Sequence, residues 1–178
     1  MSEILEEHYG YLADNVKIER YQQAIDAVVR PEHVVVDLGC GSGILGLMAL
    51  RAGARKVFFV EDGSVIEIAR KTITDAGFAD RAEFFQKYSF RLTLPEKADV
   101  VICDHVGYFG FDYGILELLA DAKSRFLRPD GVVIPAEIEL KLAPIESDDC
   151  RKLVSQWQDG GIAEEFACPF PRGRTTRV

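Results

Sequence analysis

Residues 34–46 read VVVDLGCGSGILG, and this stretch decides the fold. It opens with three valines without polar alternation, as expected of a central parallel strand that is covered on both faces. A turn containing Gly39, Gly41 and Gly43 follows directly, and residues 44–52 have helical spacing before a terminating glycine. The order of strand, glycine turn and helix predicts the opening unit of a doubly wound α/β fold.

The same alternation continues on both sides of this unit. Apolar spacing predicts helices over residues 16–29, 64–77 and 115–127, and Ser64 and Glu67 have capping-box spacing at the start of the second. Strands are predicted over residues 57–60, 82–86, 99–103, 131–135 and 137–142, and no further element after Pro144. We therefore expect one Rossmann-like α/β domain, with a doubly wound, mostly parallel sheet and helices on both faces.

Composition narrows the class of protein. The chain has 178 residues, of which 48% are hydrophobic, enough for one main core. Its 21 basic and 29 acidic residues give a net charge of -8, which argues against binding to nucleic acid or to an anionic membrane. The 4 cysteines form no C-x-x-C pair and no histidine has metal-ligand spacing, so no metal site is expected. With no apolar segment of ~20 residues either, we expect a cytoplasmic protein.

Two carboxylates flank the predicted ligand position. Asp37 comes two residues before the first glycine of the turn, where a carboxylate can orient the loop or contact an ammonium group of a ligand through water. Glu61 ends the second strand, where a carboxylate accepts hydrogen bonds from both hydroxyls of a ribose. Together they predict a site for S-adenosylmethionine, an adenosine with a charged amino-acid tail. A simpler interpretation, in which Asp37 only caps the following helix, also stays open.

The same residues allow a nicotinamide dinucleotide as an alternative ligand. Residues 41–46 satisfy the pattern G-x-G-x-x-G, and Glu61 follows at a suitable distance. Two observations favour the methyl donor. Asp37 would place a negative charge near the pyrophosphate of a dinucleotide, and the chain is short for a dehydrogenase with a substrate domain.

Beyond the glycine turn, the chain resembles the protein arginine methyltransferases from about residue 8 to residue 142. The resemblance includes residues 35–45, Gly107-Tyr108-Phe109 after the fourth strand, and the turn at residues 127–131. It implies a class I methyltransferase fold with S-adenosylmethionine as the cofactor. The methyl acceptor that it implies is a protein arginine, and a small nitrogen or oxygen nucleophile is the other acceptor that we consider.

In that family, two glutamates hold the guanidinium of the target arginine, because two carboxylates match its planar fork of donors. The first glutamate position is Asp104 here, which is one methylene shorter, and the second is Tyr113, with Asp112 one residue before it. His105 lies beside Asp104, and a histidine can take up a proton near neutral pH. We single out Asp104, His105 and Asp112 as candidate catalytic residues. The missing second acid also allows a cofactor-binding module that no longer catalyses.

The resemblance also implies a set of cofactor residues. Lys17 stands where the family has an arginine that meets the cofactor carboxylate, and Tyr11 replaces a methionine near the sulfonium. Phe90 stands where the family contacts the adenine amino group, which leaves the neighbouring Ser89 as the polar candidate. The full set of candidate cofactor residues is His8, Lys17, Asp37, Gly39, Gly41, Gly43, Glu61 and Ser89.

Three regions are expected along the chain. Residues 1–30 are predicted to form a helical lid on the cofactor, and residues 31–144 the cofactor-binding domain. Residues 145–178 are expected to be the start of a truncated or variant C-terminal region, because the family continues into a β-barrel half that nothing here matches. The expected partner is the methyl acceptor.

Overall fold

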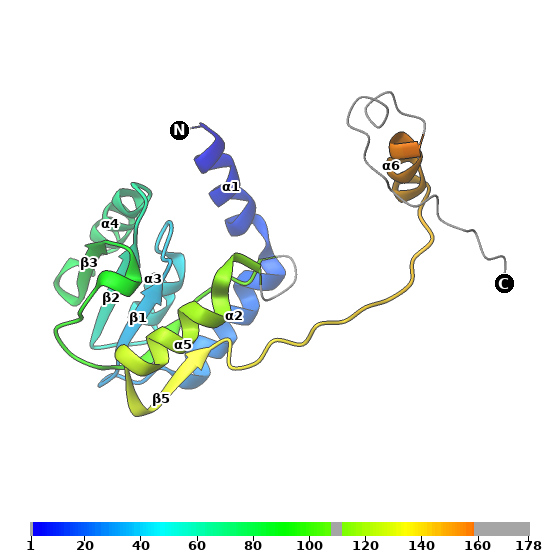
Figure 1. Ribbon diagram of the computed structural model, residues 1–178. Helices are drawn as coiled ribbons and strands as arrows, with labels where there is room; N and C mark the ends of the chain where they lie inside the picture. Colours follow the sequence, from blue (N-terminus) through cyan, green and yellow to red (C-terminus); the bar gives the residue numbers. More distant parts are fainter. Residues whose placement is uncertain (1, 108–111, 159–178) are drawn as a thin grey trace. The chain divides into compact units, whose positions relative to one another are not determined.

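The computed structural model describes residues 2–107 and 112–158. The chain divides into two compact units, Met1–Leu140 and Lys141–Val178, and the first carries the whole sheet (Figure 1). In the second unit, the described element is the helix α6 (Asp148–Gln158). None of the helices within the described ranges is long and apolar enough to span a membrane.

The sheet has five strands in the order β3-β2-β1-β4-β5, and every pairing is parallel. Its strands are β1 (Val34–Leu38), β2 (Lys56–Glu61), β3 (Ala82–Gln86), β4 (Ala98–Ile102) and β5 (Leu127–Ile134). The strand order reverses between β1 and β4, so a crevice is expected outside the carboxyl ends of these two strands. The predicted doubly wound α/β architecture is confirmed.

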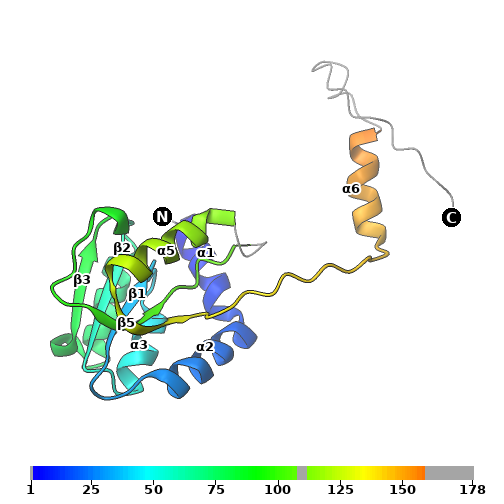
Figure 2. The ribbon, with the colours of Figure 1, turned by 60° about the horizontal axis from the view of Figure 1, so that its bottom comes forward.

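Helices cover the sheet on both faces (Figure 2). One core packs α2 (Asn15–Val28), α3 (Ile44–Arg51) and α4 (Ile66–Asp75) against one face, and the other packs α5 (Ile115–Arg125) against the opposite face. Phe59 belongs to the first core and its neighbour Phe58 to the second, as the alternation of side chains along a strand requires. The helix α1 (Ser2–Ala13) precedes α2 and falls in the region predicted to be a helical lid.

Close packing of α3 on the sheet depends on one glycine. Gly46 lies in α3, and a Cβ atom at this position would overlap the Phe59 ring of β2. A larger residue would push the helix away from β1, which is buried at every position. The third glycine of the G-x-G-x-x-G pattern therefore sets the helix–sheet distance.

Two predictions about the end of the sheet are wrong. The strand β5 begins at Leu127, so it includes the turn sequence expected to precede it, and three extra residues form a bulge between the pairs Ala98–Leu127 and Val100–Val132. Residues 137–142 alternate between charged and apolar side chains, yet they form no strand. Alternation alone is insufficient because a strand also needs a hydrogen-bonded neighbour.

Two helix predictions also need correction. The helix α6 lies after Pro144, where the sequence predicts no element. Its sequence is dominated by charged and polar residues, which hides the apolar spacing of a helix. Ser64 does not cap α4: the N-cap is Val65, which has no side-chain cap. Glu67 pairs with Arg70 at 3.4 Å instead of completing a capping box.

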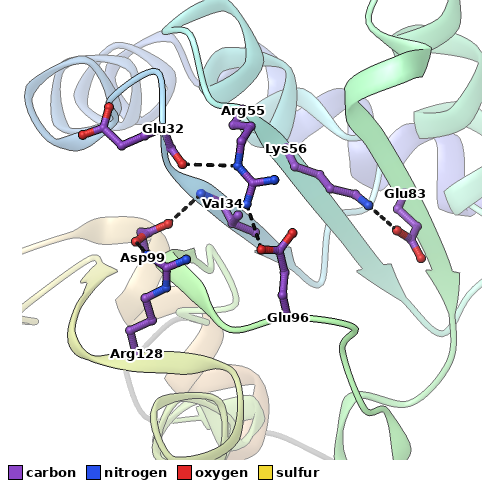
Figure 3. Close-up of polar contacts among 8 residues, drawn as sticks. All are labelled: Glu32, Val34, Arg55, Lys56, Glu83, Glu96, Asp99 and Arg128. Carbon is purple, nitrogen blue, oxygen red and sulfur yellow. Dashed lines mark hydrogen bonds and ion pairs between the residues drawn. The ribbon is translucent and has the colours of Figure 1, made fainter.

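Polar contacts hold the amino-terminal ends of the parallel strands in place (Figure 3). Asp99 Oδ2 accepts a hydrogen bond from Val34 N at 2.7 Å, and its Oδ1 pairs with Arg128 at 2.7 Å. The ion pairs Arg55–Glu96 at 2.8 Å and Lys56–Glu83 at 2.7 Å lie at the same edge of the sheet. The glycine turn follows the carboxyl end of β1, so these contacts lie at the opposite ends of the strands.

Candidate functional site

The glycine turn connects the carboxyl end of β1 to α3. Gly39, Gly41 and Gly43 have φ angles of 72°, 49° and 80°, a region that glycine adopts without strain. The amides of Gly39 and Cys40 donate to the carbonyl of Val60 at 2.8 and 3.0 Å. The turn is thereby fixed beside the end of β2, where a ligand can approach bare backbone.

Asp37 links β1 to the start of α3. Its side chain is 2% exposed, and its Oδ2 accepts a hydrogen bond from Gly46 N at 2.7 Å. The N-cap of α3 is Gly43, which has no side chain to satisfy the first amides of the helix. Asp37 satisfies one of these amides from the neighbouring strand. The simpler interpretation of Asp37, as a cap for the following helix, is thus met in the structure.

The electrostatics of the site favour a positively charged ligand. Burial raises the pKa of Asp37 from 3.8 to about 7; the hydrogen bond from Gly46 opposes this rise, and the charges of Asp104 and Glu61 add to it. Both carboxylates are therefore close enough to Asp37 for their negative charges to disfavour its ionised form. A ligand with positive groups relieves this repulsion, whereas a pyrophosphate would increase it.

Glu61 holds two backbone segments together at the end of β2. Its Oε2 accepts a hydrogen bond from Gly41 N at 3.1 Å, and its Oε1 accepts one from Gly63 N at 2.9 Å. The carboxylate therefore orients the glycine turn as well as ending the strand. Its position beside Gly41 is where the sequence predicts contacts with a ribose.

An ion pair connects α2 to the end of β4. Lys17 Nζ lies 2.8 Å from Asp104 Oδ2, and the two side chains are 26% and 32% exposed. Tyr21, one turn further along α2, donates its hydroxyl proton to the carbonyl of Cys103 at 3.0 Å. Burial raises the pKa of Tyr21, so it stays a hydrogen-bond donor at neutral pH. These contacts bring Lys17 and Asp104 to the same edge as Asp37.

The two outlying cofactor candidates differ in their surroundings. The ring of His8, from α1, lies against the glycine turn, because a Cβ atom at Gly41 would be 2.7 Å from His8 Cε1. Ser89 is buried and begins the short helix η2 (Ser89–Arg91), which follows β3. Its carbonyl accepts a hydrogen bond from Arg125 at 2.8 Å, and the neighbouring Phe90 is exposed.

The structure describes the surroundings of the candidate catalytic residues His105 and Asp112 only in part. His105 is exposed and makes an edge contact with Tyr113, with the ring centroids 5.6 Å apart. Tyr113 has φ 62°, an unusual angle for a residue with a side chain. Asp112 begins the turn η3 (Asp112–Gly114), but the N-cap of α5 is Gly114 without a side-chain cap. The side chain of Asp112 and the predicted motif residues Tyr108 and Phe109 lie outside the described part of the chain.

Sequence reasoning missed three residues that shape this site. Gly46 was visible only as part of the competing dinucleotide pattern, yet its amide holds Asp37. Tyr21 gave no polar signal because it reads as one apolar position of a helix. Arg125 fixes the carbonyls of Ser89 and Leu92 from α5, a contact between segments more than 30 residues apart that no local pattern reveals.

Known proteins are similar to this chain in sequence and fold. Residues 21–139 match the family model described as ribosomal protein L11 methyltransferase (PrmA). Protein arginine N-methyltransferase PRMT10 of Oryza sativa subsp. japonica is 39% identical over 142 residues, which are 77% of this chain and 37% of that protein. Protein arginine N-methyltransferase 1 of Chlamydomonas reinhardtii is 30% identical over 164 residues, which are 90% of this chain and 48% of that protein.

Two solved structures share the fold. The Arabidopsis thaliana protein arginine methyltransferase 10 has a TM-score of 0.70 at 29% identity, covering 87% of this chain and 46% of that chain. The Trypanosoma brucei PRMT1 enzyme-prozyme heterotetrameric complex with AdoHcy has a TM-score of 0.67 at 32% identity, covering 71% and 40%. The chain spans less than half the length of these relatives. It belongs to the methyltransferase family that the matching model describes, and it is a protein arginine methyltransferase-like protein.

Proposed function

We propose that this chain is the cofactor-binding part of an S-adenosylmethionine-dependent methyltransferase whose acceptor is a protein arginine. S-adenosylmethionine is the cofactor, in keeping with the methyltransferase family model and with the AdoHcy in the Trypanosoma brucei complex. The arginine acceptor rests on the names of the relatives, which are protein arginine N-methyltransferases.

One observation carries the proposal: the carboxylates of Asp37, Glu61 and Asp104 lie near one another, beside a turn whose glycines expose the backbone to a ligand. Asp37 is buried there with its pKa raised to about 7 by burial and, in smaller part, by the charges of Asp104 and Glu61. S-adenosylmethionine brings an ammonium and a sulfonium, and both are positive. These negatively charged side chains therefore fit S-adenosylmethionine better than they fit a dinucleotide with its negative pyrophosphate.

Each candidate residue has a distinct task toward the cofactor. Glu61 would accept hydrogen bonds from the ribose hydroxyls, Asp37 would face the ammonium and Lys17 would face the carboxylate. The turn with Gly39, Gly41 and Gly43 gives the backbone approach, Ser89 lies on the adenine side, and His8 on α1 covers the turn as part of a lid formed by residues 1–30. When bound, the cofactor supplies a methyl group on a sulfonium that a nucleophile can displace.

On the acceptor side, the chain mainly aligns the nucleophile and keeps water away. Asp104 accepts a hydrogen bond from an N–H group of the molecule to be methylated, and this contact orients the lone pair of the reacting nitrogen. His105 receives the proton that leaves the nitrogen, and Asp112 contributes a further carboxylate. Tyr113 has a phenol in place of a carboxylate and φ 62° at the position of the second acid. This departure favours, as a second candidate, a module that binds the cofactor without turnover.

The first test is isothermal titration of the full chain with S-adenosylhomocysteine, and with NAD as the competing ligand. We expect micromolar binding of S-adenosylhomocysteine and none of NAD. The variant Asp37→Ala/Glu61→Ala should lose at least ~10-fold in affinity, because it removes two of the carboxylates. Glu83→Ala, which removes a carboxylate at the opposite edge of the sheet, is the matched control. Binding of NAD instead would contradict the proposal.

The second test measures methyl transfer from labelled S-adenosylmethionine to a peptide with one arginine and to the same peptide with lysine. Transfer to the arginine peptide alone, reduced ~100-fold by Asp104→Asn, is the expected result. Tight cofactor binding with no transfer to either peptide would instead favour the binding module.

A further inference from the structure

The ion pair between Lys17 and Asp104 joins the two halves of the proposed site. Lys17 lies in the first turn of α2, and its amide donates to Asp14 Oδ1 at 3.0 Å, so the start of the helix is held in place. Its ammonium lies 4.7 Å from the centroid of the Tyr11 ring and 2.8 Å from Asp104 Oδ2. A lysine on the cofactor side is therefore paired with the carboxylate on the acceptor side.

This pairing determines the charge that an acceptor meets. A lysine ammonium is a compact point charge, so its interaction with one carboxylate is weakened when a second carboxylate arrives beside it. The amino-acid tail of S-adenosylmethionine, which in the proposed function lies next to Asp37, carries a carboxylate as well as an ammonium. Bringing that carboxylate to Lys17 places two like charges around one cation, and their repulsion drives them apart.

We infer that Asp104 and the cofactor carboxylate compete for Lys17, so that cofactor binding releases Asp104 for a cationic acceptor. The inference rests on the proposed function and deepens it. Without cofactor, Lys17 neutralises Asp104, and the acceptor side attracts a cation weakly. With cofactor bound, the charge of Lys17 is matched by the ligand, and Asp104 is available to the N–H groups of a cation such as a guanidinium.

The test compares three ligands by isothermal titration of the full chain. S-adenosylhomocysteine has both the carboxylate and the ammonium, S-adenosyl-3-thiopropylamine has only the ammonium, and methylthioadenosine has neither. Asp104→Asn removes the competitor with little change in shape. It should bind S-adenosylhomocysteine about 5-fold more tightly, the factor expected for a partly exposed ion pair. It should bind the other two ligands no more tightly than the unchanged chain does.

Two control variants make the result specific. In a Lys17→Met background, Asp104→Asn should give no gain, because the shared cation is absent. Glu96→Gln also removes one negative charge, but from the opposite edge of the sheet (Figure 3), and should leave all three affinities unchanged. Thermal unfolding of each variant checks that it is folded.

A second readout follows the acceptor side. A peptide with one arginine should bind more tightly when S-adenosylhomocysteine is present, and Asp104→Asn should abolish this gain. An unchanged or lower affinity of Asp104→Asn for S-adenosylhomocysteine, or an equal gain with methylthioadenosine, would overturn the inference while leaving the proposed function intact. Failure of every variant to bind S-adenosylhomocysteine would overturn both.

Discussion

Asp37 combines a structural and an electrostatic task in one buried carboxyl group. It satisfies the Gly46 amide at the start of α3, and it lies among the carboxylates of the candidate site. Burial is the largest cause of its raised pKa, so part of the population is protonated near neutral pH. A ligand ammonium favours the ionised form. Binding of such a ligand near pH 7 is therefore expected to release a proton from Asp37.

The raised pKa of Asp37 predicts an unusual dependence of stability on pH. The folded chain keeps this proton between pH 3.8 and about 7, where the unfolded chain loses it, so the contribution of Asp37 to stability falls as the pH rises through this window. Asp37→Asn keeps an oxygen for Gly46 and does not titrate. Relative to this variant, the unchanged chain should lose roughly 2 kcal/mol of unfolding free energy between pH 5 and pH 7.

Urea unfolding at pH 5, 6, 7 and 8 measures this difference. Parallel stability profiles for the two proteins would mean that Asp37 is ionised throughout the range. A control in which Glu83→Gln is compared over the same range should follow the unchanged chain, since Glu83 lies at the surface in an ion pair with Lys56.

At the scale of elements, α5 positions the segment after β3 through one side chain. Arg125 pairs with Asp121 and donates to the carbonyls of Leu92 at 2.5 Å and Ser89 at 2.8 Å, so one guanidinium spans both ends of η2. This geometry uses the planar fork of arginine, which lysine lacks. A helix on one face of the sheet thus holds the candidate adenine side of the site.

Replacing Arg125 should therefore affect stability and ligand binding together. Arg125→Lys keeps the charge but loses the fork, and we expect it to cost ~1–2 kcal/mol of unfolding free energy. Its affinity for S-adenosylhomocysteine should fall because Ser89 and Phe90 lose their support. Lys71→Met breaks the exposed pair with Asp75 and should cost less than ~0.5 kcal/mol. Thermal unfolding and titration check both variants, and an Arg125→Lys protein with unchanged affinity would contradict this role.

Local patterns predicted most elements, and the failures have physical causes. The valines of β1 and the glycine turn are local signals, because burial on both faces and positive φ angles each demand particular residues. Residues 137–142 have the alternation of a strand but are not part of one, because strand formation depends on distant residues as well. The Lys17–Asp104 pair joins residues 87 apart and is equally invisible to a local pattern. Sequence reasoning thus predicted the residues of the candidate site but not the contacts between them.

At the scale of the whole molecule, all the described contacts of the candidate site lie in the first unit. The glycine turn, Glu61, Lys17 and Asp104 all belong to Met1–Leu140, which also contains both hydrophobic cores. We predict that a chain of residues 1–140 folds and binds S-adenosylhomocysteine within ~3-fold of the full chain, a difference of less than ~1 kcal/mol. Circular dichroism and titration test this, and loss of binding would assign residues 141–178 a part in the site.

The parallel pairing of β1 has a consequence for synthesis of the chain. β1 pairs with β2 on one side and with β4 on the other. A ribosome adding ~5–20 residues per second releases β2 several seconds before β4. During that interval, β1, which is buried at every position of the folded sheet, has an open hydrogen-bonding edge. An unpaired apolar strand can pair with other chains, so we expect aggregation to be favoured at this stage.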